Sequence, residues 1–130
     1  MDPASGSIRT FLRVEGLAAF GVSVAGYAQW SHQGWVLFAL LFLVPDLSML
    51  GYLRGPRVGA AAYNLVHTYI GPALLGALAV CWWSDVWLAV ALIWSAHIGL
   101  DRLLGYGLKW PTSFQATHLG PIGRARVSGA

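Results

Sequence analysis

The sequence is short of charge. Only 10% of its 130 residues are Asp, Glu, Lys or Arg, whereas 57% are hydrophobic. Soluble domains average about 25% charged residues, so this chain has too little charge to cover a water-exposed surface of its size. It also has a single cysteine, Cys81, which excludes an intrachain disulfide framework and leaves the redox compartment open. The composition therefore predicts a membrane protein.

Apolar sequence is abundant, in stretches long enough to cross a bilayer. A spanning helix needs about 20 predominantly apolar residues. Four segments meet this length: 12–30, 34–53, 58–82 and 85–104. The connections between them are short, which places consecutive helices antiparallel. We therefore expect a single integral membrane domain over 1–130, an all-α four-helix transmembrane bundle of up-down topology. The first ten residues are expected to be a loose tail. About 110–130, which are polar and rich in Gly and Pro, are expected to form a cytoplasmic tail that lies over the mouth of the bundle.

The basic residues are distributed on one side only. They lie before the first segment, between the second and third, and at or after the end of the fourth: Arg9, Arg13, Arg54, Arg57, Arg102, Lys109, Arg124 and Arg126. In an antiparallel bundle all of these places fall on the same side, which the positive-inside rule assigns to the cytoplasm. We therefore expect a multi-pass protein of the inner (plasma) membrane with both termini cytoplasmic. The net charge of +3 then reflects membrane topology rather than binding to nucleic acid.

Ionisable side chains interrupt the apolar segments at a similar depth. They are Glu15, Asp46, His67, His97 and Asp101. Counted inward from the nearest basic residue, Asp46, His67 and His97 lie roughly 12, 15 and 7 Å deep, and the other two lie nearer the cytoplasm. An acidic side chain at the centre of a span costs about 2.5–3.5 kcal/mol. Carboxylates alone repel one another, so a shared cation is the least costly remedy. We predict a polar, metal-binding site in the inner half of the bilayer.

Helical spacing supports convergence on one site. His97 and Asp101 are separated by one turn and share a helix face, as do Asn64 and His67. We expect Asp46, His67, His97 and Asp101 to be the metal ligands. Asn64 is expected to orient the imidazole of His67, because metal-bound histidines usually have such a partner. Mixed imidazole and carboxylate ligands favour Zn, Mn or Fe over Mg.

Each of these residues also has a purely structural interpretation. His97 and Asp101 can form a hydrogen-bonded pair inside the bundle. Asp46 can cap a helix that restarts after Pro45. Glu15 can pair with a neighbouring arginine or with the helix dipole.

Other polar residues also have both a structural and a functional interpretation. Arg102 and Lys109 fit the positive-inside rule, and they can also bind a phosphate. His118 is interpreted as a loop residue, and His32, which lies in an outer loop and is expected to have no acidic neighbour, is set aside.

The chain resembles a family of short bacterial membrane proteins known only as a domain of unknown function. The stretches that carry this resemblance are "LRVEGLAAF", "LFLVPDLSMLGYLRGPRVGAAAYNLVHTYIGPALL" and "HIGLDRLLGYGLKWPTSFQATHLGPIGR". It covers nearly the whole chain and implies four spans, without an assigned activity.

A more remote resemblance is to LexA-regulated membrane-bound metal-dependent hydrolases. The matching motifs are "PDLS" with Pro45 and Asp46, "VHTY" with His67, "SAHIGLD" with Ser95, His97 and Asp101, and "GYGLKWP" with Gly107, Trp110 and Pro111. The chain departs from that family at Ser48, where a second acid is usual, and at 64–68, where Arg-Gly before Thr-His is missing. The resemblance implies a metal-dependent hydrolase with a reduced ligand set.

These observations lead to one main functional hypothesis and two alternatives. The main one is a metal-dependent hydrolase of a lipid or lipid-linked phosphoester. In it, Glu15 is the general base, and Arg102 and Lys109 bind an anionic lipid headgroup. The first alternative is a haem protein in which His67 and His97 are the axial ligands. The second is a non-enzymatic small transporter, proton relay or partner subunit. The oligomeric state is left open.

Overall fold

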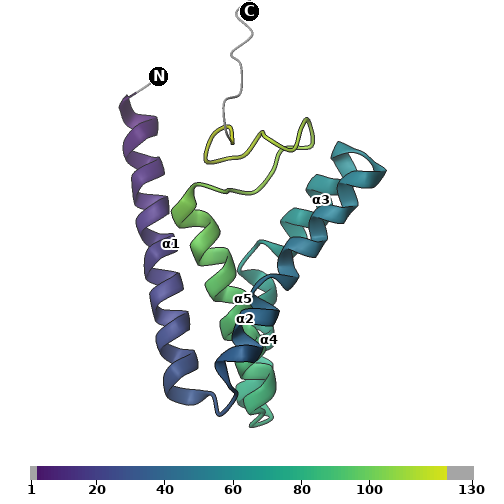
Figure 1. The fold of residues 1–130 in the computed structure, drawn as a ribbon. Coiled ribbons are helices and arrows are strands. Elements are labelled where there is room, and N and C mark those ends of the chain that lie inside the picture. Colours follow the sequence, from purple (N-terminus) through teal and green to yellow (C-terminus); the bar gives the residue numbers. More distant parts are fainter. Residues whose placement is uncertain (1–2, 123–130) are drawn as a thin grey trace, which may run out of the picture.

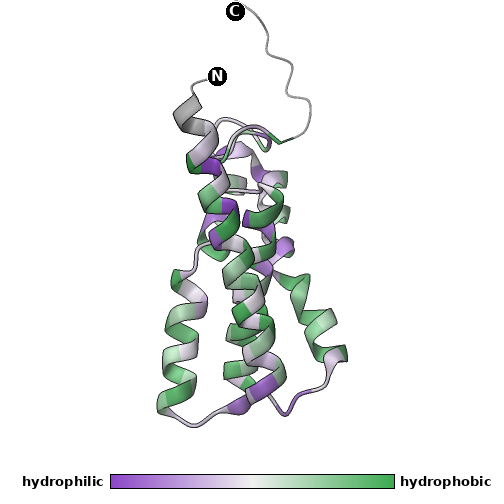
Figure 2. Cartoon of the chain, turned by 90° about the vertical axis from the view of Figure 1, so that its left-hand side faces the viewer, coloured by the Kyte–Doolittle hydropathy of each residue, from purple (hydrophilic) through white to green (hydrophobic). Residues whose placement is uncertain are grey.

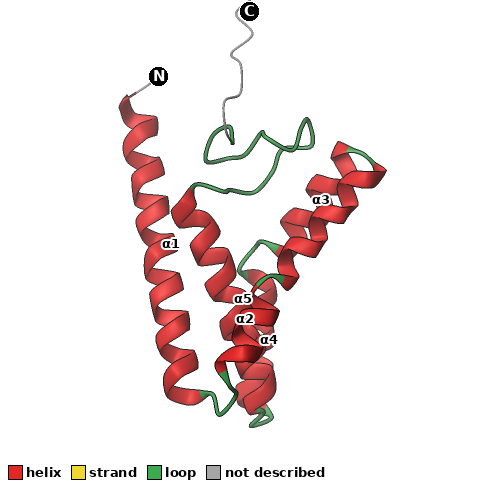
Figure 3. Ribbon diagram, in the orientation of Figure 1, coloured by secondary structure: helices red, strands yellow, loops and turns green. Residues whose placement is uncertain are grey.

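The computed structural model describes residues 3–122, and helices account for most of them (Figures 1 and 3). The elements in chain order are α1 (Pro3–Trp30), α2 (Trp35–Phe42), the 3-10 helix η1 (Val44–Arg54), α3 (Pro56–Val66), α4 (Ile70–Cys81) and α5 (Asp85–Leu104). The described residues contain no β-strand beyond a single bridge between Lys109 and Thr117. The predicted all-α class is confirmed.

Four helical stretches are long and apolar enough to cross a membrane. They are Gly6–Trp30, Trp35–Arg54, Pro56–Cys81 and Asp85–Leu104. The first and last are unbroken, whereas the second consists of α2 and η1 and the third of α3 and α4. The expectation of a loose N-terminal tail is wrong, because α1 already begins at Pro3. Proline is favourable in a first helical turn, where its missing N–H costs no hydrogen bond.

The helices form two packed groups that separate toward one end of the bundle (Figure 1). α1 and α4 pack against α5, and α3 packs against η1. α1 and α5 approach closely at Gly16 and Gly99, where neither helix has a side chain to hold the backbones apart. A core of Tyr27, Ala89 and Ile93 joins α1 to α5 near the opposite end.

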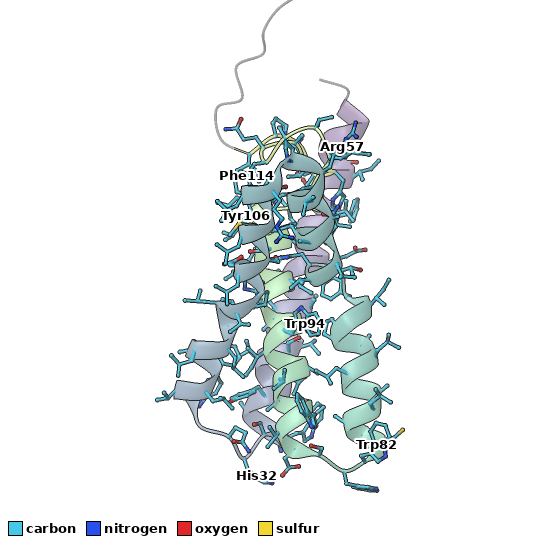
Figure 4. The ribbon with its side chains drawn as sticks, turned by 90° about the vertical axis from the view of Figure 1, so that its right-hand side faces the viewer. His32, Arg57, Trp82, Trp94, Tyr106 and Phe114 are labelled. Atoms are coloured by element: carbon cyan, nitrogen blue, oxygen red, sulfur yellow. The ribbon has the colours of Figure 1, made fainter. Side chains whose placement is uncertain are left out.

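The outer surface of the bundle is apolar. Large hydrophobic side chains on α1, α2, η1 and α4 are exposed, with Val36 at 75% and Leu53 at 86%. Figure 2 shows hydrophobic residues in green along the helices, and polar residues in purple within the upper half and at the lower turns. Arg57 lies at one end, and His32 and Trp82 lie at the other (Figure 4). Such an apolar exterior is suited to lipid, and the protein is a multi-pass membrane protein.

The segment that follows α5 folds back over one end of the bundle. α5 ends at Leu104 and is capped by Gly105, which has φ +91°, a left-handed conformation that glycine adopts without steric cost. From there the chain crosses toward α3 (Figure 1). Both amide atoms of Asn64 bind the backbone of Lys109, at 2.8 and 2.6 Å, and fasten the segment to α3. Part of the C-terminal tail expected over about 110–130 is therefore ordered, and 123–130 lie outside the described residues.

Candidate metal centre

The second span breaks at a proline. Pro45 has no N–H, so a regular α-helix cannot continue through it, and α2 ends at Phe42. The chain continues as η1, in which the backbone N–H of Asp46 donates to the carbonyl of Leu43 at 3.2 Å. The N-cap of η1 is Leu43, and Asp46 lies in the first turn of η1 instead of capping it. Its carboxylate faces two imidazoles of other spans.

The third span breaks directly after His67, and α5 compensates for the break. The carbonyl of Val66 accepts a hydrogen bond from the Trp94 indole at 2.7 Å. The carbonyl of His67 accepts one from Arg102 at 2.9 Å. In a membrane such freed backbone groups persist only where other protein groups satisfy them. Pro72 accounts for the break, because it cannot donate the α-helical hydrogen bond one turn back.

Two imidazoles and two carboxylates converge at these breaks. The ligand atoms of Asp46, His67, His97 and Asp101 all lie within 4.8 Å of one another. The two Nε2 atoms are 3.1 Å apart. The carboxylate oxygens of Asp46 and Asp101 lie 3.3 to 3.6 Å from these nitrogens. Both histidines are buried. The His/Asp cluster, as we call these residues, could hold a metal ion.

The tautomer of His67 is determined by its backbone contact. Its Nδ1 lies 2.9 Å from the carbonyl of Tyr63, and a carbonyl can only accept, so Nδ1 carries the proton. Nε2 therefore presents a lone pair to the other members of the cluster. Metal-bound histidines usually donate their second nitrogen to a carbonyl or carboxylate in this way.

The hydrogen bonding of the His97 imidazole indicates which kind of ion the cluster could hold. Its Nδ1 is buried without a hydrogen bond of good geometry, although the carbonyl of Phe42 is close enough to interact with the imidazole. Without a cation, a proton on His97 Nε2 must separate the two Nε2 lone pairs. A cation held by both Nε2 atoms would require the proton of His97 to sit on Nδ1, on the side of the Phe42 carbonyl. The donor set thus fits a divalent ion.

Tyr63 connects the cluster to its surroundings. Its ring stacks on His67, with the centroids 3.7 Å apart and the planes at 8°. Its hydroxyl donates to Asp101 at 3.3 Å. Because its carbonyl also binds His67 Nδ1, this one residue positions two members of the cluster.

A cavity of about 250 Å³ opens onto the cluster. Both carboxylates line it, together with Tyr63, Lys109 and residues of the segment after α5. Lys109 is buried, donates to the carbonyl of Phe114 at 2.8 Å, and lies over the rings of Phe114 and Tyr63. Burial lowers the pKa of the Lys109 ammonium, and the nearby Asp101 partly opposes that shift. The cavity therefore combines acidic groups with one cationic group.

Comparison with known proteins identifies a family. The family model "Domain of unknown function (DUF4260)" matches residues 9–122. The chain belongs to this family. No curated protein and no solved structure matches it significantly. The matched region includes every member of the His/Asp cluster.

Three other predicted site residues of the DUF4260 domain have different surroundings from those expected. Asn64 does not orient His67, because both of its amide atoms bind Lys109. Arg102 is not free for a headgroup, because it is buried and donates to the carbonyls of His67 and Tyr106. Glu15 lines a separate cavity of about 160 Å³ with Arg102 and His118, so the structure does not bring it to the cluster.

The remaining histidines of the DUF4260 domain lie away from the cluster. His118 accepts a hydrogen bond from the backbone N–H of Leu108, and burial lowers its pKa. His32 was expected to have no acidic neighbour, but its Nε2 lies 3.7 Å from Asp85. The expectation was wrong because two outer turns that are distant in sequence meet at the same end of the bundle (Figure 4).

Sequence reasoning missed Tyr63. The available signal was its spacing, since it precedes His67 by one helical turn and therefore shares its face. An aromatic residue at that position is commonly interpreted as part of the hydrophobic core. For this reason the contact of its hydroxyl with Asp101 is not predicted from the sequence.

Proposed function

We propose that this protein is a membrane-embedded metalloprotein that holds one divalent transition ion through Asp46, His67, His97 and Asp101. The observation that supports this most strongly is that ligand atoms from η1, α5 and the end of α3 lie within 4.8 Å of one another. Two imidazoles and two carboxylates suit Zn²⁺, Mn²⁺ or Fe²⁺ better than Mg²⁺. The distribution of basic residues supports placing both termini in the cytoplasm and the protein in the inner membrane.

The chemistry that fits this site is hydrolysis of an anionic ester. A divalent ion held with an open position lowers the pKa of bound water to about 7. The cavity beside Asp46 and Asp101 provides space for a substrate next to the cluster. Lys109, on the same cavity, supplies a positive charge for a phosphoester. Because Glu15 lines a different cavity, we assign the role of base to one of the two carboxylates that line this one.

The haem alternative is disfavoured by the geometry. Axial Nε2 atoms must lie on opposite faces of a porphyrin, but here they are 3.1 Å apart and both face the carboxylates of Asp46 and Asp101. That separation leaves no space for a macrocycle between the rings.

Metal content tests the proposal directly. Protein purified in detergent should contain about one Zn, Mn or Fe per chain by elemental analysis, and chelated protein should rebind one equivalent. A purified, folded protein that contains none of these metals and takes up none after chelation would contradict it.

Replacing Tyr63 by phenylalanine should weaken metal binding without preventing it. The substitution removes the hydroxyl that contacts Asp101 and keeps the ring stacked on His67. Loss of a residue that orients a ligand typically costs 10- to 100-fold in metal affinity, and we expect about tenfold here. Competition with a chromophoric zinc chelator measures it.

The matched control is Tyr27→Phe. Tyr27 is also buried and also donates a hydrogen bond, to the carbonyl of Gly34 at 2.8 Å, but it lies in the core between α1 and α5. Its variant should bind zinc like the wild type. Equal affinities for the two variants would show that the Tyr63 hydroxyl does not position Asp101.

A further inference from the structure

A larger cavity lies on another side of the same helix breaks. It has a volume of about 490 Å³ and is lined by residues of α2, η1, α3 and α5, among them Leu41, Leu47, Val66, Val90 and Trp94. This volume is in the range of small-molecule sites, about 300–1,000 Å³. All of these residues belong to the membrane-spanning stretches.

The polar side chains of this apolar cavity are already hydrogen-bonded. The Ser48 hydroxyl donates to the carbonyl of Pro45 at 2.7 Å. The Trp94 indole donates to the carbonyl of Val66 at 2.7 Å. The other lining side chains are hydrocarbon. A water molecule needs two to four polar partners to stay in a cavity, and these side chains offer only the acceptor lone pairs of the Ser48 hydroxyl, so the chemistry favours a hydrocarbon occupant.

The cavity is accessible from the surface that faces lipid. Val44 and Leu47, which line it, are 47% and 62% exposed. A hydrocarbon chain from the bilayer can therefore enter from the side. Water-soluble ligands have no comparable route across the apolar exterior of the spans.

The cavity wall is continuous with the His/Asp cluster. Pro45 and Val66 line the cavity, and the residues that follow them are Asp46 and His67. A chain seated in the cavity would therefore contact residues that directly precede two members of the cluster. The cavity that contains Lys109 lies on the other side of Asp46 and can take a charged head group.

We propose that the apolar cavity binds the hydrocarbon chain of a membrane lipid and so places its anionic head group at the His/Asp cluster beside Lys109. This inference rests on the proposed function for the head-group end, and it names the substrate class of the metal site. The chain-binding part stands on the cavity alone.

The test uses the whole protein in phosphatidylcholine nanodiscs that contain a phosphatidic acid with a diazirine in its acyl chain. After irradiation, mass spectrometry locates the labelled residues. We expect labelling at Leu47 and Val66 in the wild type. Val90→Phe, which fills the cavity from α5, should lose that labelling. The matched control Val22→Phe should keep it, because Val22 lies on α1, is 71% exposed and lines no cavity described among residues 3–122.

The outcomes separate the two proposals. If Val90→Phe does not fold, Val44→Phe at the cavity mouth gives the same comparison. Equal labelling of the cavity-filling variant and Val22→Phe, or labelling spread evenly over all spans, overturns the lipid-chain site. Metal content is measured on the same samples. Cavity labelling in a protein that binds no metal would refute the metal centre and retain the chain site.

Discussion

Replacing His67 or His97 by alanine is expected to abolish stoichiometric metal binding. Each imidazole supplies one of only four donor groups, and the two Nε2 atoms face each other at 3.1 Å across the centre of the cluster. Loss of residues that merely orient a ligand costs about 10- to 100-fold. Removing a ligand itself should therefore cost more than about 100-fold, because one of the four bonds to the ion is lost outright rather than misaligned.

Two measurements check this expectation. Isothermal titration of chelated protein with Zn²⁺ should show one site in the wild type and none at micromolar concentrations in either variant. Thermal unfolding gives a second readout, since a ligand present at 100 times its Kd stabilises the folded state by about 2.7 kcal/mol. Zinc should raise the Tm of the wild type and leave that of both variants unchanged.

His32→Ala is the matched control. The same imidazole is removed, but from a side chain that is 81% exposed and lies at the other end of the bundle, 3.7 Å from Asp85. This variant should bind zinc like the wild type. Retention of one zinc per chain by both His67→Ala and His97→Ala would exclude the His/Asp cluster as the metal site.

The sequence predicts the spans and the cluster for the same physical reason. Long apolar segments are required by the thickness of the bilayer, and acids within them are costly enough that several at one depth indicate a shared site. Asp46, His67, His97 and Asp101 could therefore be selected without knowing how the helices pack. The proposed ligand roles still await a measurement of bound metal.

The surroundings of the cluster could not be predicted in this way. Helical spacing correctly places Asn64 and His67 on one face, but it does not reveal that the backbone of Lys109 returns to bind Asn64. Likewise, Arg102 follows the positive-inside rule, but the sequence does not reveal that its guanidinium donates to the carbonyl of His67, which the helix break leaves without a backbone donor. These contacts depend on the two helix breaks, and the sequence predicts only the break at Pro45.

Glu15 shows the limit of depth as a criterion. It lies at a similar level to the cluster along the chain, but α1 packs on α5 through Gly16 and Gly99 and so presents Glu15 to a different cavity. Depth gives the position of a residue only along the membrane normal. The rotation of the helix and its neighbours determine the other two coordinates, and a single sequence carries little information about them.

Gly99→Leu is expected to cause the largest loss of stability among single substitutions in α5. A Cβ atom at this position would lie 2.6 Å from the backbone nitrogen of Phe20 and 2.8 Å from the carbonyl oxygen of Gly16. Backbone atoms in a helix cannot rotate away as a side chain can. Overpacking typically costs 1–3 kcal/mol, and we expect about 3 kcal/mol or more, because α1 must shift as a whole.

Thermal unfolding in detergent, read by circular dichroism, measures this loss, with Gly21→Leu as the matched control. Gly21 lies in α1, the partner helix of this crossing, and nothing lies within 4 Å of its added Cβ, so that variant should melt like the wild type. A Gly99→Leu protein that melts with Gly21→Leu would show that α1 and α5 are not in close contact. Because α1 supplies none of the cluster residues, the molecules of Gly99→Leu that remain folded should still bind one metal ion each. The variant thus separates the stability of the helix crossing from the integrity of the metal site.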